Sequence, residues 1–159
     1  MKTILVPVDF SPVSESVVKE AAALARSLDG RVVLLTVVQL PVVLNEYDAL
    51  VDIAKITAAG EKNATRQLEK LEEKLKNQFV KAESVKVTGT PVANILEQAE
   101  KFAADYIIMG SHGHTAFYDL LVGSTTHGVL MRSKCPVVIV PAVKEGSKTR
   151  KKEKRAAVA

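Results

Sequence analysis

Residues 105–126 contain three glycines, and the three histidines of the protein lie in or beside this segment. It reads DYIIMGSHGHTAFYDLLVGSTT, so two residues separate the first two glycines and nine separate the last two. Glycine allows the backbone to approach a ligand closely and to adopt positive φ. A Gly-Ser step that opens a helix presents unpaired N–H groups and a hydroxyl to an anion. The spacing therefore predicts a site for a phosphate chain. Its residues are Gly110, Gly113 and Gly123, with Ser124, Thr125 and Thr126 directly after the last.

Two better-known phosphate motifs are absent from the sequence. There is no Gly-x4-Gly-Lys-Ser/Thr, and no Gly-x-Gly-x-x-Gly follows the first apolar run. The alternative interpretation of the segment is a glycine-rich loop that holds no ligand, because short glycine patterns are common. The elements on either side of the segment help to choose between these interpretations.

Apolar periodicity predicts alternating strands and helices. Five short apolar runs predict β-strands over residues 2–8, 31–38, 82–88, 106–109 and 136–140. Apolar residues at steps of three and four predict helices over residues 12–28, 61–79, 91–102 and 123–132. The second helix is expected to begin near Asp52, and Met131 on the last is expected to lie in the core.

The ends of two helices carry recognisable signals. Ser11 and Thr90 each precede a proline that suits the first helical position, so both are predicted as N-caps. Gly30 follows the first helix and is predicted to adopt the left-handed conformation that commonly ends a helix.

This order of elements predicts an α/β fold. Strands that alternate with helices form a parallel sheet with right-handed crossovers. We expect a single doubly wound, Rossmann-like sheet of five parallel strands in the order 3-2-1-4-5, with helices on both faces. Ligands of such sheets bind beyond the carboxyl ends of the strands where the strand order reverses. Asp9 leaves the first strand there and Gly110 leaves the fourth, so topology and glycine chemistry indicate the same place.

Charge divides the chain into a body and a tail. Residues 144–159 hold seven Lys and Arg against two Glu, whereas residues 1–143 hold fifteen against sixteen acidic residues. We therefore predict one domain over residues 1–143 and a basic, disordered tail over residues 144–159. The near-neutral body argues against a nucleic-acid-binding domain, and only weak, non-specific binding through the tail is expected.

Composition also indicates a compartment. The single cysteine, Cys135, cannot form an internal disulfide, which suits a reducing cytoplasm. The apolar run near the start ends at Asp9, which makes it too short for a signal peptide. No apolar stretch reaches the roughly 18 residues of a membrane-spanning helix. We expect a cytoplasmic protein with no membrane partner.

Three segments together resemble the ATP-binding branch of the universal stress protein family. They are ILVPVDFS at residues 4–11, the glycine segment, and CPVVIVP at residues 135–141. Each is modest alone, but their order and spacing are specific. The resemblance covers residues 2–141 and leaves the tail outside.

The resemblance implies an adenine nucleotide, with ATP the first candidate, AMP or ADP the alternatives, and Mg²⁺ present or absent. No metal ligand set is assigned. Carried over by position, Pro7 and Asp9 would lie by the adenosine and Val37 would meet the adenine. The ribose and phosphates would be lined by Gly110, Ser111, Gly113, His114 and Thr115. The phosphate chain would be held by Gly123, Ser124, Thr125 and Thr126.

Two residues depart from the family pattern. Thr36 stands where the family often has His, and His114 stands where many members have Lys or Arg. A neutral imidazole attracts phosphate less than a fixed cation does. Modest nucleotide affinity at pH 7, rising as the pH falls, is therefore expected.

The family further implies a homodimeric regulatory protein of stress survival rather than an enzyme. We expect pairing through the apolar edge strand that runs from Pro136 to Val140, because such an edge aggregates unless it is paired. A slow ATPase or phosphotransferase is one alternative, with Asp9 on a metal and His112 or His114 as a base. No Lys or Arg lies between residues 105 and 129 to stabilise transferred charge, which counts against it. A ligand-free dimeric interaction module is the other alternative.

Overall fold

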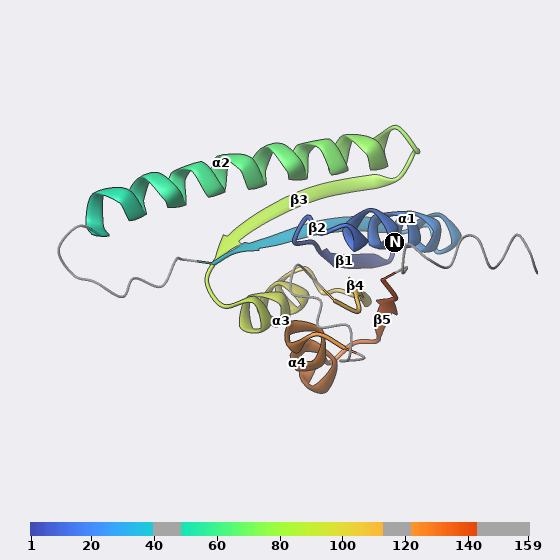
Figure 1. Ribbon diagram of the computed structural model, residues 1–159. Coiled ribbons are helices and arrows are strands. Elements are labelled where there is room, and N and C mark those ends of the chain that lie inside the picture. The colour runs from blue at the N-terminus through green and yellow to red at the C-terminus, as the bar shows by residue number, and fades with distance from the viewer. Residues whose placement is uncertain (40–48, 113–121, 143–159) are drawn as a thin grey trace, which may run out of the picture.

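The computed structural model describes residues 1–39, 49–112 and 122–142 and contains a five-stranded parallel sheet (Figure 1). The strand order β3-β2-β1-β4-β5 confirms the predicted fold class and topology. The strands are β1 (Thr3–Pro7), β2 (Arg31–Val38), β3 (Lys81–Thr88), β4 (Tyr106–Gly110) and β5 (Val137–Val140). The predicted tail at residues 144–159 lies outside the described residues.

Four helices cover the two faces of the sheet (Figure 1). They are α1 (Val13–Ser27), α2 (Ala49–Lys76), α3 (Pro91–Lys101) and α4 (Ser124–Arg132). Helices α1 and α2 pack on one face, and α3 and α4 lie together on the other. Helix α2 begins three residues before the predicted Asp52 and ends at Lys76, short of residue 79. Within the described residues, no helix is long and apolar enough to cross a membrane.

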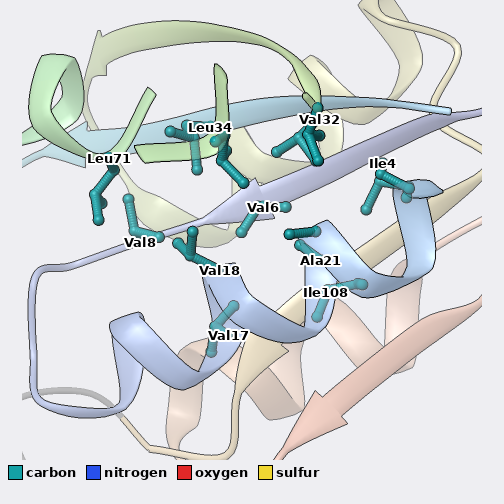
Figure 2. Close-up of a cluster of buried hydrophobic side chains, with 14 of the residues drawn as sticks. Ile4, Val6, Val8, Val17, Val18, Ala21, Val32, Leu34, Leu71 and Ile108 are labelled. Atoms are coloured by element: carbon teal, nitrogen blue, oxygen red, sulfur yellow. The ribbon is translucent and has the colours of Figure 1, made fainter. Parts of the chain in front are cut away.

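Alternation along the strands divides the core into two clusters, because successive side chains of a strand point to opposite faces. Ile4 and Val6 face α1 and α2 and belong to the same cluster as Val17 of α1 and Leu71 of α2 (Figure 2). Leu5 lies between them in sequence and faces α3 instead. Each fully buried Val, Leu or Ile contributes about 1.5–3 kcal/mol to stability. The second cluster is formed by Leu5, Val33, Leu35, Ile95, Ile107, Met109 and Val129.

The end of α1 corrects one prediction. Asp29, not Gly30, adopts the left-handed conformation, with φ at 47°. Gly30 is required for a different reason: a Cβ atom there would lie 2.8 Å from the carbonyl oxygen of Lys2. The glycine thus permits close contact between the start of β2 and the start of β1, where Arg31 N–H donates to the same oxygen (2.7 Å).

The start of α1 corrects a second prediction. Pro12 is the N-cap, and the buried Oγ of Ser11 has no hydrogen-bond partner among the described residues. Instead, the Asp9 carboxylate accepts a hydrogen bond from Ser11 N–H (3.0 Å). At α3 the N-cap is Thr90 with Pro91 first in the helix, as predicted, although the Thr90 side chain makes no capping bond.

Candidate functional site

A cleft of about 290 Å³ lies at the carboxyl end of the sheet, where β1 and β4 diverge. Its volume is at the lower end of the roughly 300–1,000 Å³ typical of small-molecule sites. The position is the reversal point of the strand order that the sequence indicated. Among the predicted site residues, those that line the cleft are Pro7, Asp9, Val37, Gly110, Gly123, Ser124, Thr125 and Thr126.

Of the remaining four predicted residues, one is described and three lie outside the described residues. Ser111 is described and buried, but it does not line the cleft. Gly113, His114 and Thr115 lie outside the described residues. His112, considered above as a base, does line the cleft.

The turn from β1 into α1 places Asp9 at the cleft. Asp9 Oδ1 accepts hydrogen bonds from Ser11 N–H (3.0 Å) and Ser14 Oγ (3.2 Å). Phe10, which lies between Asp9 and Ser11, has a φ of 62°. This left-handed conformation costs a non-glycine residue about 1 kcal/mol or more. Phe10 packs against the core cluster under α1, and this packing offsets the strain. Strained backbone of this kind concentrates at ligand sites.

The buried hydroxyl of Thr36 fixes the end of β1. Thr36 Oγ1 donates to the Val8 carbonyl oxygen (2.8 Å), and Val8 N–H donates to Leu35 O (2.8 Å). These two bonds continue the link between β1 and β2 for one residue after β1 ends at Pro7. The threonine that departs from the family pattern therefore has a structural partner in this chain.

The main chain of Val37 faces the cleft. In a parallel ladder, alternate residues of a strand bond to opposite neighbours. Leu35 O accepts from Val8 on the β1 side, and Val38 O accepts from Gly89 N–H on the β3 side (3.0 Å). Val37 is therefore the next residue directed toward β1, but β1 has already ended. Its N–H and C=O are left without a strand partner at the edge of the cleft, and buried backbone groups require one.

Helix α4 points its amino terminus into the other end of the cleft. Its N-cap, Gly123, donates its own N–H to Ser111 O (2.7 Å), and its carbonyl accepts from His127 N–H (2.8 Å). The N–H groups of the first three helical residues have no partner within the helix. They carry the partial positive charge of the helix dipole and favour an anion. These donors belong to Ser124, Thr125 and Thr126.

The two glycines of the cleft serve different purposes. A Cβ at Gly110 would lie 2.7 Å from Val13 Cγ1, so this glycine lets α1 pack against the end of β4. Thr126 Oγ1 then donates to Gly110 O (2.8 Å) and holds α4 in place. A Cβ at Gly123 would lie 3.4 Å from Ser111 O, an ordinary contact. Among the described residues, packing therefore does not require a glycine at position 123.

Sequence reasoning missed the apolar end of the cleft. Leu35 and Ile95 line it beside Val37, and Pro91 lines it from the first turn of α3. Gln39, just past the end of β2, adds an exposed amide. The two-residue period of β2 was the available signal, since residues 35, 37 and 39 share one face.

Charge in the cleft is sparse. Among the described residues that line it, Asp9 is the only carboxylate, and none is Lys or Arg. Within the same part of the chain, no group of three or more His, Cys, Asp or Glu side chains could hold a metal ion. A Mg²⁺ ion here would therefore need phosphate oxygens and water among its ligands, which is its usual binding mode beside one or two carboxylates.

Comparison with known proteins gives one consistent result. The model of the universal stress protein family matches residues 1–141. Universal stress protein MJ0577 of Methanocaldococcus jannaschii is 31% identical over 152 residues, covering 87% of this chain and 94% of that protein. YxiE of Bacillus subtilis is 28% identical over 144 residues, covering 86% and 96%.

Solved structures agree with these sequence matches. The structure of MJ0577 has a TM-score of 0.81 at 30% identity and covers 91% of this chain and 98% of that one. A universal stress protein in complex with cAMP has a TM-score of 0.67 at 26% identity, covering 87% and 96%.

Proposed function

Because this chain belongs to the universal stress protein family, we propose that its cleft binds ATP, with ADP and AMP as alternatives. Nucleotide occupancy would then regulate its role in the stress response. The observation that carries the proposal is a cleft with two sets of backbone groups that have no strand or helix partner within the described residues. The main chain of Val37 lies at its apolar end and the first turn of α4 at the other.

The two ends of the cleft are chemically complementary to the adenine and the phosphates of a nucleotide. Adenine presents an amino donor and a ring-nitrogen acceptor, which suit the C=O and N–H of Val37. Leu35 and Ile95 supply apolar surface for the base. The phosphates suit the N–H groups and hydroxyls of Ser124 and Thr125. The related structure that contains cAMP supports an adenine nucleotide as the ligand class.

Mg²⁺ accompanies the triphosphate in this proposal. Asp9 is the carboxylate that lines the cleft in the described chain, so it is the candidate ligand beside the phosphates. Asp9→Ala should weaken both ATP and AMP if Asp9 acts on the adenosine. A loss confined to ATP would assign Asp9 to the metal and phosphates instead.

Regulation rather than efficient catalysis follows from the charges. Phosphoryl transfer depends on cations that stabilise the transferred group, and the described cleft residues offer no Lys or Arg. We therefore assign no catalytic residue. Release of inorganic phosphate from ATP at more than a trace rate by the purified protein would favour the ATPase alternative.

The functional unit of the proposal is a cytoplasmic homodimer paired through β5. This edge strand contains Val138, which is 39% exposed. Leu130 and Met131, on the helix that leads into it, are 47% and 69% exposed. Met131 was predicted in the core, and its exposure corrects that prediction. Pairing β5 with its copy around a two-fold axis would satisfy the edge and cover apolar surface.

Calorimetry with ATP tests the nucleotide site. Gly123→Val adds a branched side chain where the backbone would meet phosphate, and ATP binding should be lost while circular dichroism stays unchanged. Gly60→Val is the matched control, because nothing lies within 4 Å of a Cβ at Gly60 on exposed α2. Equal ATP affinity in all three proteins would refute the site.

Mass spectrometry of ligands released from purified, denatured protein identifies the bound nucleotide. ATP, ADP or AMP at near one per chain would support the proposal. If calorimetry also detects no binding of any of the three to the wild-type protein, the ligand-free interaction module becomes the better description.

A further inference from the structure

Ser111 is a buried junction between the cleft and β5. Its side chain and backbone are 93% buried, since only 7% of the residue is exposed. Its N–H donates to Val140 O (2.8 Å) and its carbonyl accepts from Gly123 N–H (2.7 Å). Its Oγ accepts from Ala142 N–H (3.1 Å) and lies 3.0 Å from His112 Nδ1. All three of its polar groups therefore have partners.

The position of the hydroxyl proton follows from this arrangement. A serine hydroxyl has one proton to donate and two lone pairs to accept with. Ala142 N–H can only donate, so it occupies one lone pair of Ser111 Oγ. Among the described residues the one acceptor within reach of the hydroxyl proton is His112 Nδ1. The proton lies on that bond, and Nδ1 of His112 accepts it.

We propose that Ser111 is a positioning residue that fixes the imidazole of His112 in the form protonated at Nε2. A neutral imidazole carries one ring proton, so a ring that accepts at Nδ1 must donate at Nε2. His112 also takes part in at least one further interaction, and the proposal concerns only the bond between its Nδ1 and Ser111 Oγ. The family resemblance implied that Ser111 lines the ribose and phosphates, and the present proposal concerns the bond of its hydroxyl to the His112 ring.

This tautomer gives the cleft a neutral hydrogen-bond donor. His112 lines the cleft wall with Gly123 and Ser124, where the described residues offer no Lys or Arg. A ring N–H there can serve a phosphate oxygen, an assignment that rests on the proposed nucleotide function. Successive hydrogen bonds polarise one another. The run from Ala142 N–H through Ser111 Oγ to His112 therefore strengthens the donor and connects it to the end of β5.

Nitrogen NMR of the imidazole tests the tautomer without any ligand. Two-bond ¹H–¹⁵N correlation spectra of ligand-free protein at about pH 8.5, above the usual imidazole titration range, separate the two tautomers. The wild-type spectrum should show His112 protonated at Nε2. Ser111→Ala should give a mixture, and Ser111→Thr, which keeps the hydroxyl, should restore the single form. A wild-type ring protonated at Nδ1 would overturn the proposal, even if Ser111→Ala fails to fold.

Ser133→Ala is the matched control. Ser133 Oγ, like Ser111 Oγ, makes two hydrogen bonds: it accepts from Cys135 N–H (3.2 Å) and donates to Cys135 O (2.8 Å), at the far end of α4. It should lower stability comparably and leave the His112 spectrum unchanged. A change of tautomer in this variant as large as in Ser111→Ala would show a general loosening and would contradict a specific role of Ser111.

ATP titration tests the consequence for the ligand. Ser111→Ala and His112→Ala should each weaken ATP binding by about three- to tenfold, the usual effect of one hydrogen bond. Because Ser111 acts through His112, the double variant should bind ATP within about twofold of His112→Ala. If the loss of ATP affinity in the double variant equals the product of the two single losses, the positioning role of Ser111 is overturned. If wild-type protein binds no ATP, the proposed function fails, and the NMR result alone then decides the tautomer.

Discussion

The two edges of the sheet differ in chemistry. β3 forms one edge, with the sequence KAESVKVT, and α2 lies along it (Figure 1). Ser84 of β3 donates to the Glu72 carboxylate of α2, and Lys86 donates to Thr65 Oγ1 (3.2 Å). β5 forms the other edge, and its sequence, VVIV, contains no polar residue.

This difference indicates which edge is built for a partner. Charged side chains and a covering helix are the usual protection of an edge strand against pairing with another chain. β3 has both. β5 has no charged side chain, its contact with α1 leaves Val138 39% exposed, and it is preceded by the exposed Leu130 and Met131. A second copy of the chain at β5 would supply the missing cover, and β3 would remain an outer edge of the dimer.

Charging the apolar edge should have the largest effect. Val138→Lys would bury one unpaired ammonium from each copy in the proposed interface. Each such charge costs about 3 kcal/mol, so the two charges of one dimer cost about 6 kcal/mol, which is roughly ten-thousandfold in the dimer Kd. Sedimentation velocity at micromolar concentration should show a monomer, with ATP binding retained.

Thr88→Lys at the polar edge is the control for this experiment. Thr88 is an exposed residue of β3, so a further lysine there should leave the sedimentation profile of the wild-type protein unchanged. A monomer in the Thr88→Lys variant, or an intact dimer in Val138→Lys, would assign the interface to the wrong edge.

Removing the apolar surface beside β5 should have a smaller effect. Replacing both Leu130 and Met131 with Ser removes apolar area from the proposed interface but introduces no charge. The dimer Kd should rise about tenfold, which corresponds to roughly 1.4 kcal/mol. Because both side chains are exposed in the single chain, the stability of the monomer should hardly change. Analytical ultracentrifugation over a concentration series measures the first quantity and urea unfolding the second.

The sequence was sufficient for the topology because strand and helix signals depend on local periodicity. The buried runs of β1 and β2 and the stripe of Leu68, Leu71 and Leu75 on α2 each show their period directly. The handedness of the crossovers then leaves few possible orders. Even so, the strand predicted from Pro136 begins at Val137, because proline has no N–H for the ladder and offers Ile107 only its carbonyl (3.0 Å).

The sequence was insufficient to predict the role of a residue where that role depends on tertiary contacts. Gly30 was assigned a left-handed turn, but the contact that demands a glycine comes from Lys2 of the adjoining strand. Ser11 is a local case: the N-cap is the next residue, Pro12, and the Ser11 hydroxyl makes no capping bond among the described residues. At the cleft, the glycine spacing identified residues 105–126 as the segment of interest. It did not reveal that Ser111 bonds to Gly123 N–H and to Val140 O, because these hydrogen bonds depend on the tertiary structure.

Acid should loosen the covered edge selectively. Hydrogen bonds from Lys76 and then Ser84 hold the pKa of Glu72 below its ordinary value. A carboxyl group whose pKa is lowered by folding stabilises the protein above its unfolded pKa, about 4.3 for Glu, and loses this contribution as the pH falls through the folded pKa. Glu72→Gln should therefore reduce the unfolding free energy by about 1 kcal/mol at neutral pH and by less near pH 3.

Urea unfolding at the two pH values measures this difference. Glu73→Gln is the matched control, since Glu73 is the exposed neighbour on the same helix and makes no side-chain hydrogen bond among the described residues. It should behave like the wild-type protein at both pH values. A deficit in Glu72→Gln that stays constant with pH would show that the side chain acts through packing instead.

The smallest expected effect lies in the turn that leads from α2 into β3. Phe79 has a φ of 58° and is 98% exposed, so its ring contributes no packing to offset the left-handed strain. The turn itself is needed, because Val80 N–H donates to Leu75 O (3.1 Å) and Val80 is buried. Phe79→Gly should therefore raise the unfolding free energy by about 0.5–1 kcal/mol.

Phe10→Gly should change stability in the opposite direction, although the backbone conformation of Phe10 is nearly the same as that of Phe79. Its φ is 62°, but Phe10 packs against the core, so the lost contacts should outweigh the relieved strain and lower stability. Thermal unfolding of the two variants compares strain with and without packing. A loss of stability in Phe79→Gly would mean that the ring is covered in solution. Since Phe79 lies two residues before β3 begins at Lys81, that result would show that the polar edge also has a partner and would remove the contrast with β5.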